Sequence, residues 1–144
     1  MGFIDLIEEA KKDGIQHLYI AAAPVFEHTI FLLKRSIAAS THPGFFVFPT
    51  SEYQDGESIN QLLQKALLIN AGLVLDSVQD YIGHFDYDGK RQCTFIVHVK
   101  DPYAVQLSSH EAYSWVPIRE AIGYPISGEM RELLDRIIEK TNAP

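Results

Sequence analysis

Apolar residues recur along this chain with two different periods, and the change of period predicts where helices and strands lie. Near the N-terminus they are spaced three and four residues apart, at Phe3, Leu6, Ile7 and Ala10. This spacing predicts an amphipathic helix over about residues 3–13, which Gly14 can end. A similar stripe after Ser127 predicts a C-terminal helix over about residues 127–140, with Ser127 as its N-cap.

Shorter apolar runs between these helices predict strands. Residues 17–23 and 29–34 form two such runs, and a turn is expected near Pro24 and Glu27-His28. A third short strand is expected over residues 45–48. Asp88-Gly89 is a strong signal for a two-residue hairpin turn, which joins an extended run ending at Tyr87 to a strand over residues 90–99.

The middle of the chain carries clear signals for the start and the end of a helix. Ser58 followed by Gln61 is a capping box, and Gly72 is suited to the helix end. A further strand is expected over residues 113–116. Helices and strands in this order predict an α/β (α+β) fold, in which a mixed β-sheet is sandwiched between α-helices, as a single domain over residues 1–144.

Composition narrows the range of partners. The formal charge is −7, from 12 Lys plus Arg against 19 Asp plus Glu, which argues against a nucleic-acid partner. No apolar run approaches the roughly 20 residues of a membrane span, so no membrane partner is expected. Cys93 is a single cysteine and cannot form an internal disulfide, which is typical of a cytoplasmic protein.

Residues 51–73, with their flanks, resemble the Nudix hydrolase superfamily, whose box reads G-x5-E-x7-R-E-U-x-E-E-x-G-U, where U is an aliphatic residue. Glu57 lies at the early glutamate, Lys65 replaces the arginine, and three further positions match directly: Leu67, Gly72 and Leu73. The flanking segments 32–35, 48–49 and 115–118 also agree. The resemblance implies the Nudix fold and a Glu57–Lys65 ion pair that braces the box loop against its helix.

The same alignment predicts a degenerate box. Family members hold Mg²⁺ or Mn²⁺ with glutamates at positions that here carry Ala66, Ile69 and Asn70. A hard divalent cation needs oxygen ligands, preferably carboxylates, so no metal is expected at the standard site. Ser51 also replaces the opening glycine. These departures favour a non-hydrolytic or weakly active protein that binds a nucleotide-type ligand or a partner, without a cofactor.

The alternative is a Mg²⁺- or Mn²⁺-dependent hydrolase of nucleoside diphosphate-linked compounds that uses relocated acids. For it the candidate catalytic residues are Glu57 and Glu111, with Glu52 as a further loop acid. The candidate ligand-binding residues under either hypothesis are Glu52, Lys65, Phe46 and Arg35. Among the histidines, His42 and His110 are the favoured candidates for a functional role, because they lie on predicted loops. The apolar stripes of the first and last helices are compatible with a homodimer as well as with packing on the sheet.

Overall fold

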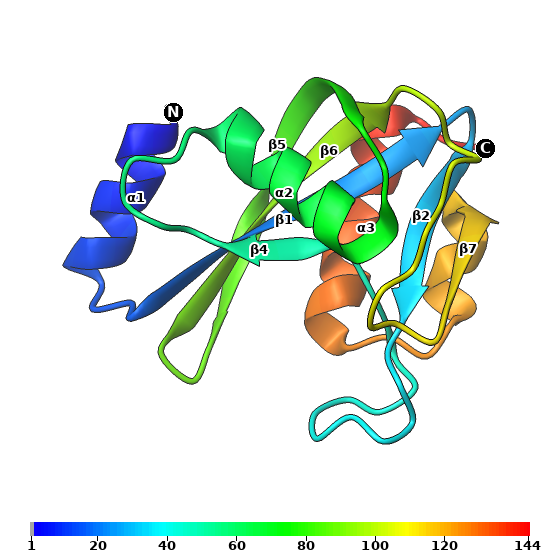
Figure 1. Cartoon of the computed structure of the whole chain (residues 1–144), viewed down its shortest axis with the longest axis horizontal. Helices are drawn as coiled ribbons and strands as arrows, with labels where there is room; N and C mark the ends of the chain where they lie inside the picture. Colours follow the sequence, from blue (N-terminus) through cyan, green and yellow to red (C-terminus); the bar gives the residue numbers. More distant parts are fainter. Residues whose placement is uncertain (1) are drawn as a thin grey trace.

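A mixed sheet with helices on both faces organises the chain in the computed structural model, which describes residues 2–144 (Figure 1). The elements in chain order are α1 (Phe3–Lys12), β1 (His17–Phe26), β2 (Thr29–Lys34), β3 (Phe46–Val47), β4 (Thr50–Glu52), α2 (Ile59–Ala71), β5 (Leu75–Tyr87), β6 (Lys90–Val99), β7 (Ala112–Pro117), the 3₁₀ helix η1 (Ile118–Gly123) and α3 (Gly128–Thr141). The predicted sandwich is confirmed.

The sheet has seven strands. Its main path is β3-β2-β1-β6-β5, while β4 pairs with β1 and β7 pairs with β2. β1 runs parallel to β6, with His17 opposite Lys90 and Pro24 opposite Val97, and the other pairs are antiparallel. β1 therefore lies at the centre of the sheet, and its side chains alternate between two separate cores.

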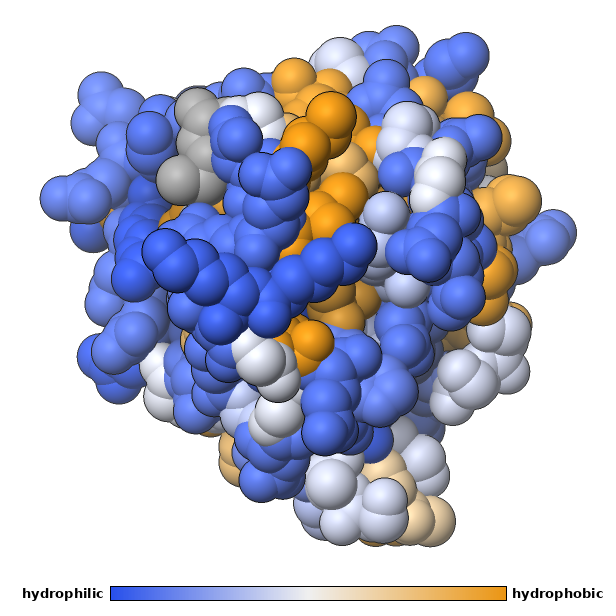
Figure 2. Space-filling view, turned by 90° about the vertical axis from the view of Figure 1, so that its left-hand side faces the viewer, coloured by the Kyte–Doolittle hydropathy of each residue, from blue (hydrophilic) through white to orange (hydrophobic). Residues whose placement is uncertain are grey.

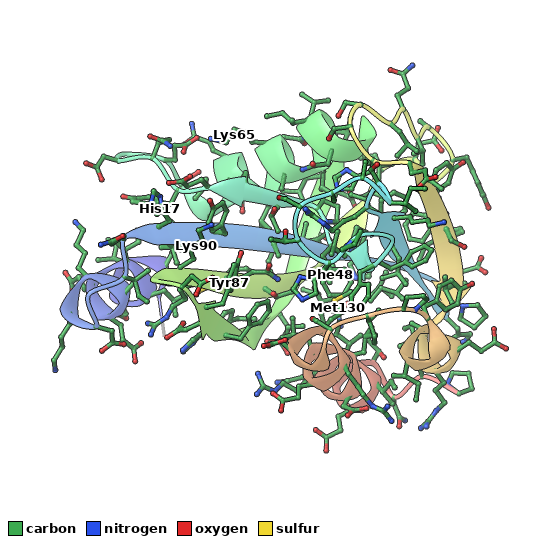
Figure 3. The ribbon with its side chains drawn as sticks, turned by 90° about the horizontal axis from the view of Figure 1, so that it is seen from below. His17, Phe48, Lys65, Tyr87, Lys90 and Met130 are labelled. Atoms are coloured by element: carbon green, nitrogen blue, oxygen red, sulfur yellow. The ribbon has the colours of Figure 1, made fainter. Side chains whose placement is uncertain are left out.

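Each face of the sheet carries its own apolar core. Ile20 and Ala22 of β1 pack on the face covered by α1 and α2, together with Leu63. Ala21 and Ala23 point to the opposite face and pack with residues of α3 and η1. Figure 3 shows this arrangement edge-on, with α2 on one side of the sheet and α3 on the other. The alternation follows from the two-residue period of side chains along a strand.

The helix signals read from the sequence are confirmed. The Ser58 hydroxyl accepts a hydrogen bond from the Gln61 N–H at 3.1 Å, and the Gln61 side chain accepts one from the Ser58 N–H at 2.8 Å. Gly72 follows α2 with a left-handed φ of 68°. Ser127 caps α3 by accepting from the Met130 N–H at 3.1 Å. Within residues 2–144, no helix combines the length and the apolar character that a bilayer span requires.

The turn expected near Pro24 is wrong in part, because β1 continues through Pro24 to Phe26 and turns at Glu27-His28. Proline lacks an N–H and is tolerated only where a strand has a free edge. β1 offers such an edge at Pro24, which falls between the residues paired with β4 and those paired with β2. β4 and η1 were not predicted.

Candidate functional site

The segment that resembles the box folds as β4, a loop over residues 53–58 (the box loop) and α2. β4 joins the sheet through β1, with Glu52 opposite Tyr19. Ser51, which stands where the family has a glycine, is almost fully buried, and its hydroxyl donates to the Leu62 carbonyl at 2.8 Å. Ser51 thus links β4 to the first turns of α2.

The predicted Glu57–Lys65 ion pair is present. The Lys65 Nζ lies 2.9 and 3.1 Å from the two carboxylate oxygens of Glu57, which also accepts a hydrogen bond from the Gln54 N–H at 2.9 Å. The hydrogen bond from Lys65 holds the pKa of Glu57 below its usual value. Both carboxylate oxygens are therefore engaged in holding the box loop against α2.

The three positions that the family uses for metal binding have other tasks here. Ala66 is fully buried, and Ile69 exposes 58% of its surface as hydrocarbon. The Asn70 side-chain amide donates to the Thr50 carbonyl at 2.9 Å and to the Ala66 carbonyl at 2.7 Å. Alanine and isoleucine offer a cation no oxygen, and asparagine offers only the neutral oxygen of its amide, where the family has carboxylates. This set of residues does not fit Mg²⁺ or Mn²⁺.

A loop after β6 covers the C-terminal end of α2. The Gln106 N–H donates to the Ala71 carbonyl at 2.8 Å, and the Ser108 hydroxyl donates to the Ile69 carbonyl at 2.7 Å. A Cβ on Gly72 would approach the Gln106 Cβ to 3.0 Å, so the loop also needs glycine at this position. The loop satisfies carbonyls that the helix end leaves without partners. The sequence carried no signal for this contact.

The structure does not gather the acids proposed for a relocated metal site. A carboxylate oxygen of Glu52 lies 2.7 Å from the His17 ring, while Glu57 is paired with Lys65 before α2. Glu111 directly precedes β7, where its N–H donates to the Lys34 carbonyl at the end of β2 at 2.9 Å. Within residues 2–144, no three His, Cys, Asp or Glu side chains come together as a group that could hold a metal ion.

Polar and aromatic side chains form a row across the sheet beside α3. Strand register aligns Glu52, Tyr19, Gln92 and Phe85 on β4, β1, β6 and β5. The neighbouring row toward the hairpin tip includes Tyr87 of β5 and Lys90 of β6. α3 covers the part of this face around Met130 but does not reach the hairpin end (Figure 3). We call the five residues Tyr19, Glu52, Phe85, Tyr87 and Gln92 the open sheet face.

Electrostatics supports the proximity of these side chains. Burial and the neighbouring Glu52 carboxylate raise the pKa of Tyr19. Burial also raises the pKa of Tyr87, although the Arg35 guanidinium acts in the opposite direction. Arg35 follows β2, and Tyr87 is the residue of this face whose pKa its charge affects. The Lys90 ammonium lies over the Tyr87 ring, 5.8 Å from the ring centroid.

The predicted ligand-binding residues divide between different parts of the molecule. Glu52 belongs to the open sheet face, whereas Arg35 is held by hydrogen bonds to the Thr41 carbonyl and hydroxyl at 2.9 and 3.2 Å. Phe46 packs edge-on against Tyr124, with ring centroids 5.0 Å apart, beside the α3 core. Lys65 lies on the other side of the sheet with α2 (Figure 3). Of these four predicted ligand-binding residues, only Glu52 belongs to the open sheet face.

Sequence reasoning missed Tyr19 and Gln92. Both lie at alternating strand positions, and only the register of three strands brings them beside Glu52 and Phe85. Of the two favoured histidines, His110 has a buried Nδ1 that finds no hydrogen-bond partner within residues 2–144. Burial lowers the pKa of His110, and the charge of Arg35 acts in the same direction.

Comparison with known proteins identifies the fold. No protein-family model and no curated protein matches the chain. Among solved structures it is similar to the MutT protein of Methanosarcina mazei Go1, with 21% identity over 87% of this chain and 94% of that one, at a TM-score of 0.71. A NUDIX hydrolase of Nitrosomonas europaea has 17% identity over 89% and 92%, at a TM-score of 0.69. An ADP-ribose pyrophosphatase of Streptococcus suis has 16% identity over 88% and 92%, also at 0.69. The chain has the Nudix fold.

Proposed function

We propose that this chain is a Nudix-superfamily protein with a degenerate box, which binds a nucleotide-type small molecule and hydrolyses it weakly or not at all. The observation that carries the proposal is the set of side chains that α2 has at the three metal-binding positions of the family. Ala66 is buried, Ile69 offers hydrocarbon, and the Asn70 amide is engaged with two carbonyls. The family's mechanism needs carboxylates there to hold the ion that activates water. This helix supplies none at those positions.

The open sheet face supports the binding half of the proposal. Tyr19, Phe85 and Tyr87 offer aromatic surface on which a flat base can stack. Gln92 and Glu52 offer hydrogen-bonding groups beside them. The similar Streptococcus suis protein is described as acting on ADP-ribose, which makes nucleoside diphosphates with a second group the first ligands to test.

A ligand with phosphates would need cations in place of a metal. Arg91 is not available, because its guanidinium is 5% exposed and is bound by Asp13 and Asp86. Lys65 is paired with Glu57. The charge of Arg35 affects the pKa of Tyr87 on the open sheet face, and Arg35 forms no ion pair within residues 2–144, so it is our candidate phosphate-binding residue.

Hydrolysis by relocated acids is the second hypothesis, and no grouping of described side chains favours it. Glu57, Glu52 and Glu111 each make different contacts in different places. Cytoplasmic location and a homodimer remain predictions from the sequence. Analytical ultracentrifugation tests the second of these.

Ligand binding in the presence of a chelator tests the proposed function. ADP-ribose, dinucleoside polyphosphates, nucleotide sugars and oxidised nucleoside triphosphates are compared by thermal shift with EDTA. A ligand at 100 times its Kd stabilises the folded protein by about 2.7 kcal/mol, which raises Tm by several degrees. The Tyr87→Ala variant should lose this rise. Tyr103→Ala, which removes a tyrosine exposed to 77% outside the open sheet face, should keep it. No rise with any of these ligands would contradict the binding proposal.

A further inference from the structure

A hollow lies between α1 and the box loop and shares Glu52 with the open sheet face. α1 contacts the box loop at its start and the sheet at its end. The Phe3 ring packs edge-on against Tyr53 with centroids 5.9 Å apart, and the Asp13 carboxylate accepts a hydrogen bond from Arg91 at 2.9 Å. Between these contacts the two segments border a hollow of about 180 Å³. On the side that carries α1, apolar surface runs between two hydrophilic margins (Figure 2).

The volume of this hollow indicates the size of the ligand that it can enclose. Sites for drug-sized molecules measure about 300–1,000 Å³, whereas an apolar cavity of about 150 Å³ holds a single benzene molecule. A hollow of about 180 Å³ is therefore too small for a nucleotide and suits a molecule of a few non-hydrogen atoms.

Both apolar and charged side chains line the hollow. Its apolar lining comes from α1, the following turn and β1: Ile7, Ala10, Ile15 and Leu18. Lys11 lines it from the α1 side, and Glu52, Tyr53 and Asp55 line it from the side of β4 and the box loop. A ligand here would meet a cation from α1, carboxylates from β4 and the box loop, and apolar side chains from α1, the following turn and β1.

The charged side chains that line this hollow form no ion pairs with one another among the described residues. Neither Lys11 nor Asp55 forms an ion pair within 4.0 Å in the part of the chain that the structure describes. Glu52 differs from them, because one of its oxygens is held by His17 at 2.7 Å. Lys11 and Asp55 are thus opposite charges that line one hollow without reaching each other. A molecule that carries both charges can bridge them.

We infer that this hollow binds a small zwitterion with an apolar body, of the class of free aliphatic amino acids. The carboxylate of the ligand pairs with Lys11, its ammonium pairs with Asp55, and its side chain packs on Ile7 and Leu18. Charge-assisted hydrogen bonds at both ends select for a molecule with both charges. The hollow shares Glu52 with the open sheet face, but none of the ligand contacts inferred here uses Glu52, so this inference does not depend on the proposed function.

Three molecules of the same shape test the inference in the full chain labelled with ¹⁵N. Leucine carries both charges, 3-methylbutylamine lacks the carboxylate, and 4-methylpentanoate lacks the ammonium. Leucine at millimolar concentration should shift the amide signals of α1 and residues 52–55 in a saturable way. Each of the other two should bind roughly tenfold more weakly or worse, since each loses one charged contact. No saturable shift with leucine, or equal binding of all three, would overturn the inference.

Variants of exposed residues separate the two charged contacts without disturbing the core. Lys11→Gln should weaken leucine binding roughly tenfold but leave 3-methylbutylamine unchanged. Asp55→Asn should weaken both of these ligands. Lys12→Gln is the matched control, because Lys12 is exposed on the same helix and does not line the hollow. Equal weakening by Lys11→Gln and Lys12→Gln would indicate a general charge effect and would overturn the site.

Discussion

The side-chain amide of Asn70 donates a hydrogen bond to the backbone carbonyl of Thr50, with nitrogen and oxygen 2.9 Å apart. It thereby ties α2 to β4, across a stretch of 20 residues. The alignment with the Nudix box places a metal-binding glutamate at position 70. In this chain the residue holds two parts of the fold together, and that role requires a hydrogen-bond donor.

Replacing this donor by an acceptor of the same shape should destabilise the fold. Asn70→Asp places a carboxylate oxygen against the Thr50 and Ala66 carbonyls, so both lose the side-chain donor and face a like-charged oxygen instead. We expect a loss of about 1–3 kcal/mol in the free energy of unfolding, measured by urea denaturation at neutral pH. Asn60→Asp is the control, because Asn60 is exposed in the first turn of the same helix, and its effect should stay within about 0.5 kcal/mol. Equal stability of Asn70→Asp and the unmodified chain would refute the role of Asn70.

Gly72 should be more sensitive to alanine than another glycine with the same backbone. Gly72 and Gly14 both have a positive φ, of 68° and 75°, so alanine is strained at either position. At Gly72 the added Cβ also meets the Gln106 Cβ at 3.0 Å and backbone nitrogen at 3.2 Å, while nothing lies within 4 Å at Gly14. Gly14→Ala should cost about 1 kcal/mol, and Gly72→Ala should cost more. Equal thermal stabilities of the two variants would show that the loop after β6 can move away.

Local sequence signals predicted the elements of this fold better than their tertiary pairing. The capping box at Ser58 and the Asp88-Gly89 turn depend on contacts a few residues apart, and both were predicted correctly. β4 consists of three polar residues that become a strand only because β1 supplies hydrogen-bond partners. A turn was predicted near Pro24 because no sequence pattern shows that β1 has a free edge at that residue.

Removal of the carboxylates that bind the buried Arg91 should destabilise the fold strongly. It donates to Asp86 at 2.7 and 2.9 Å and to Asp13 at 2.9 Å, which joins the hairpin to the end of α1. The double variant Asp13→Asn with Asp86→Asn leaves this guanidinium buried without a carboxylate. We expect a loss of about 3 kcal/mol or more in the free energy of unfolding. Either single variant should cost less, because one carboxylate remains. A double variant as stable as the two single variants would contradict this account.

The Glu57–Lys65 ion pair should contribute to stability in a way that depends on pH. Lys65 lowers the pKa of Glu57 in the folded state, so folding favours the carboxylate. This contribution is fully present above the ordinary pKa of glutamate, about 4.3, and is lost as the pH falls through the lower pKa of the folded state. Glu57→Gln should therefore melt at a lower temperature than the unmodified chain at pH 7, and the difference should shrink below about pH 4. A difference that does not change with pH would point to packing instead.

The candidate site was predicted only in part, again because it depends on register. Glu57 and Lys65 lie eight residues apart around the start of one helix, and the box pattern alone predicts their contact. Tyr19 and Gln92 meet through the parallel pairing of β1 with β6, which no local pattern indicates. The loop that covers the end of α2 was missed for the same reason, since Gln106 and Ala71 are joined by backbone atoms.

Turnover by the purified protein tests the central claim most directly. The panel contains ADP-ribose, dinucleoside polyphosphates, nucleotide sugars and oxidised nucleoside triphosphates, with Mg²⁺ or Mn²⁺, and each reaction is repeated with a chelator. Release of phosphate or nucleotide is measured with protein shown to be folded by circular dichroism. Our account predicts no metal-dependent release above a weak background, because α2 carries Ala66, Ile69 and Asn70 in place of the metal-binding glutamates. Rapid release that stops with the chelator and falls in Glu57→Gln would show that carboxylates at other positions hold the metal ion. That result would contradict our account.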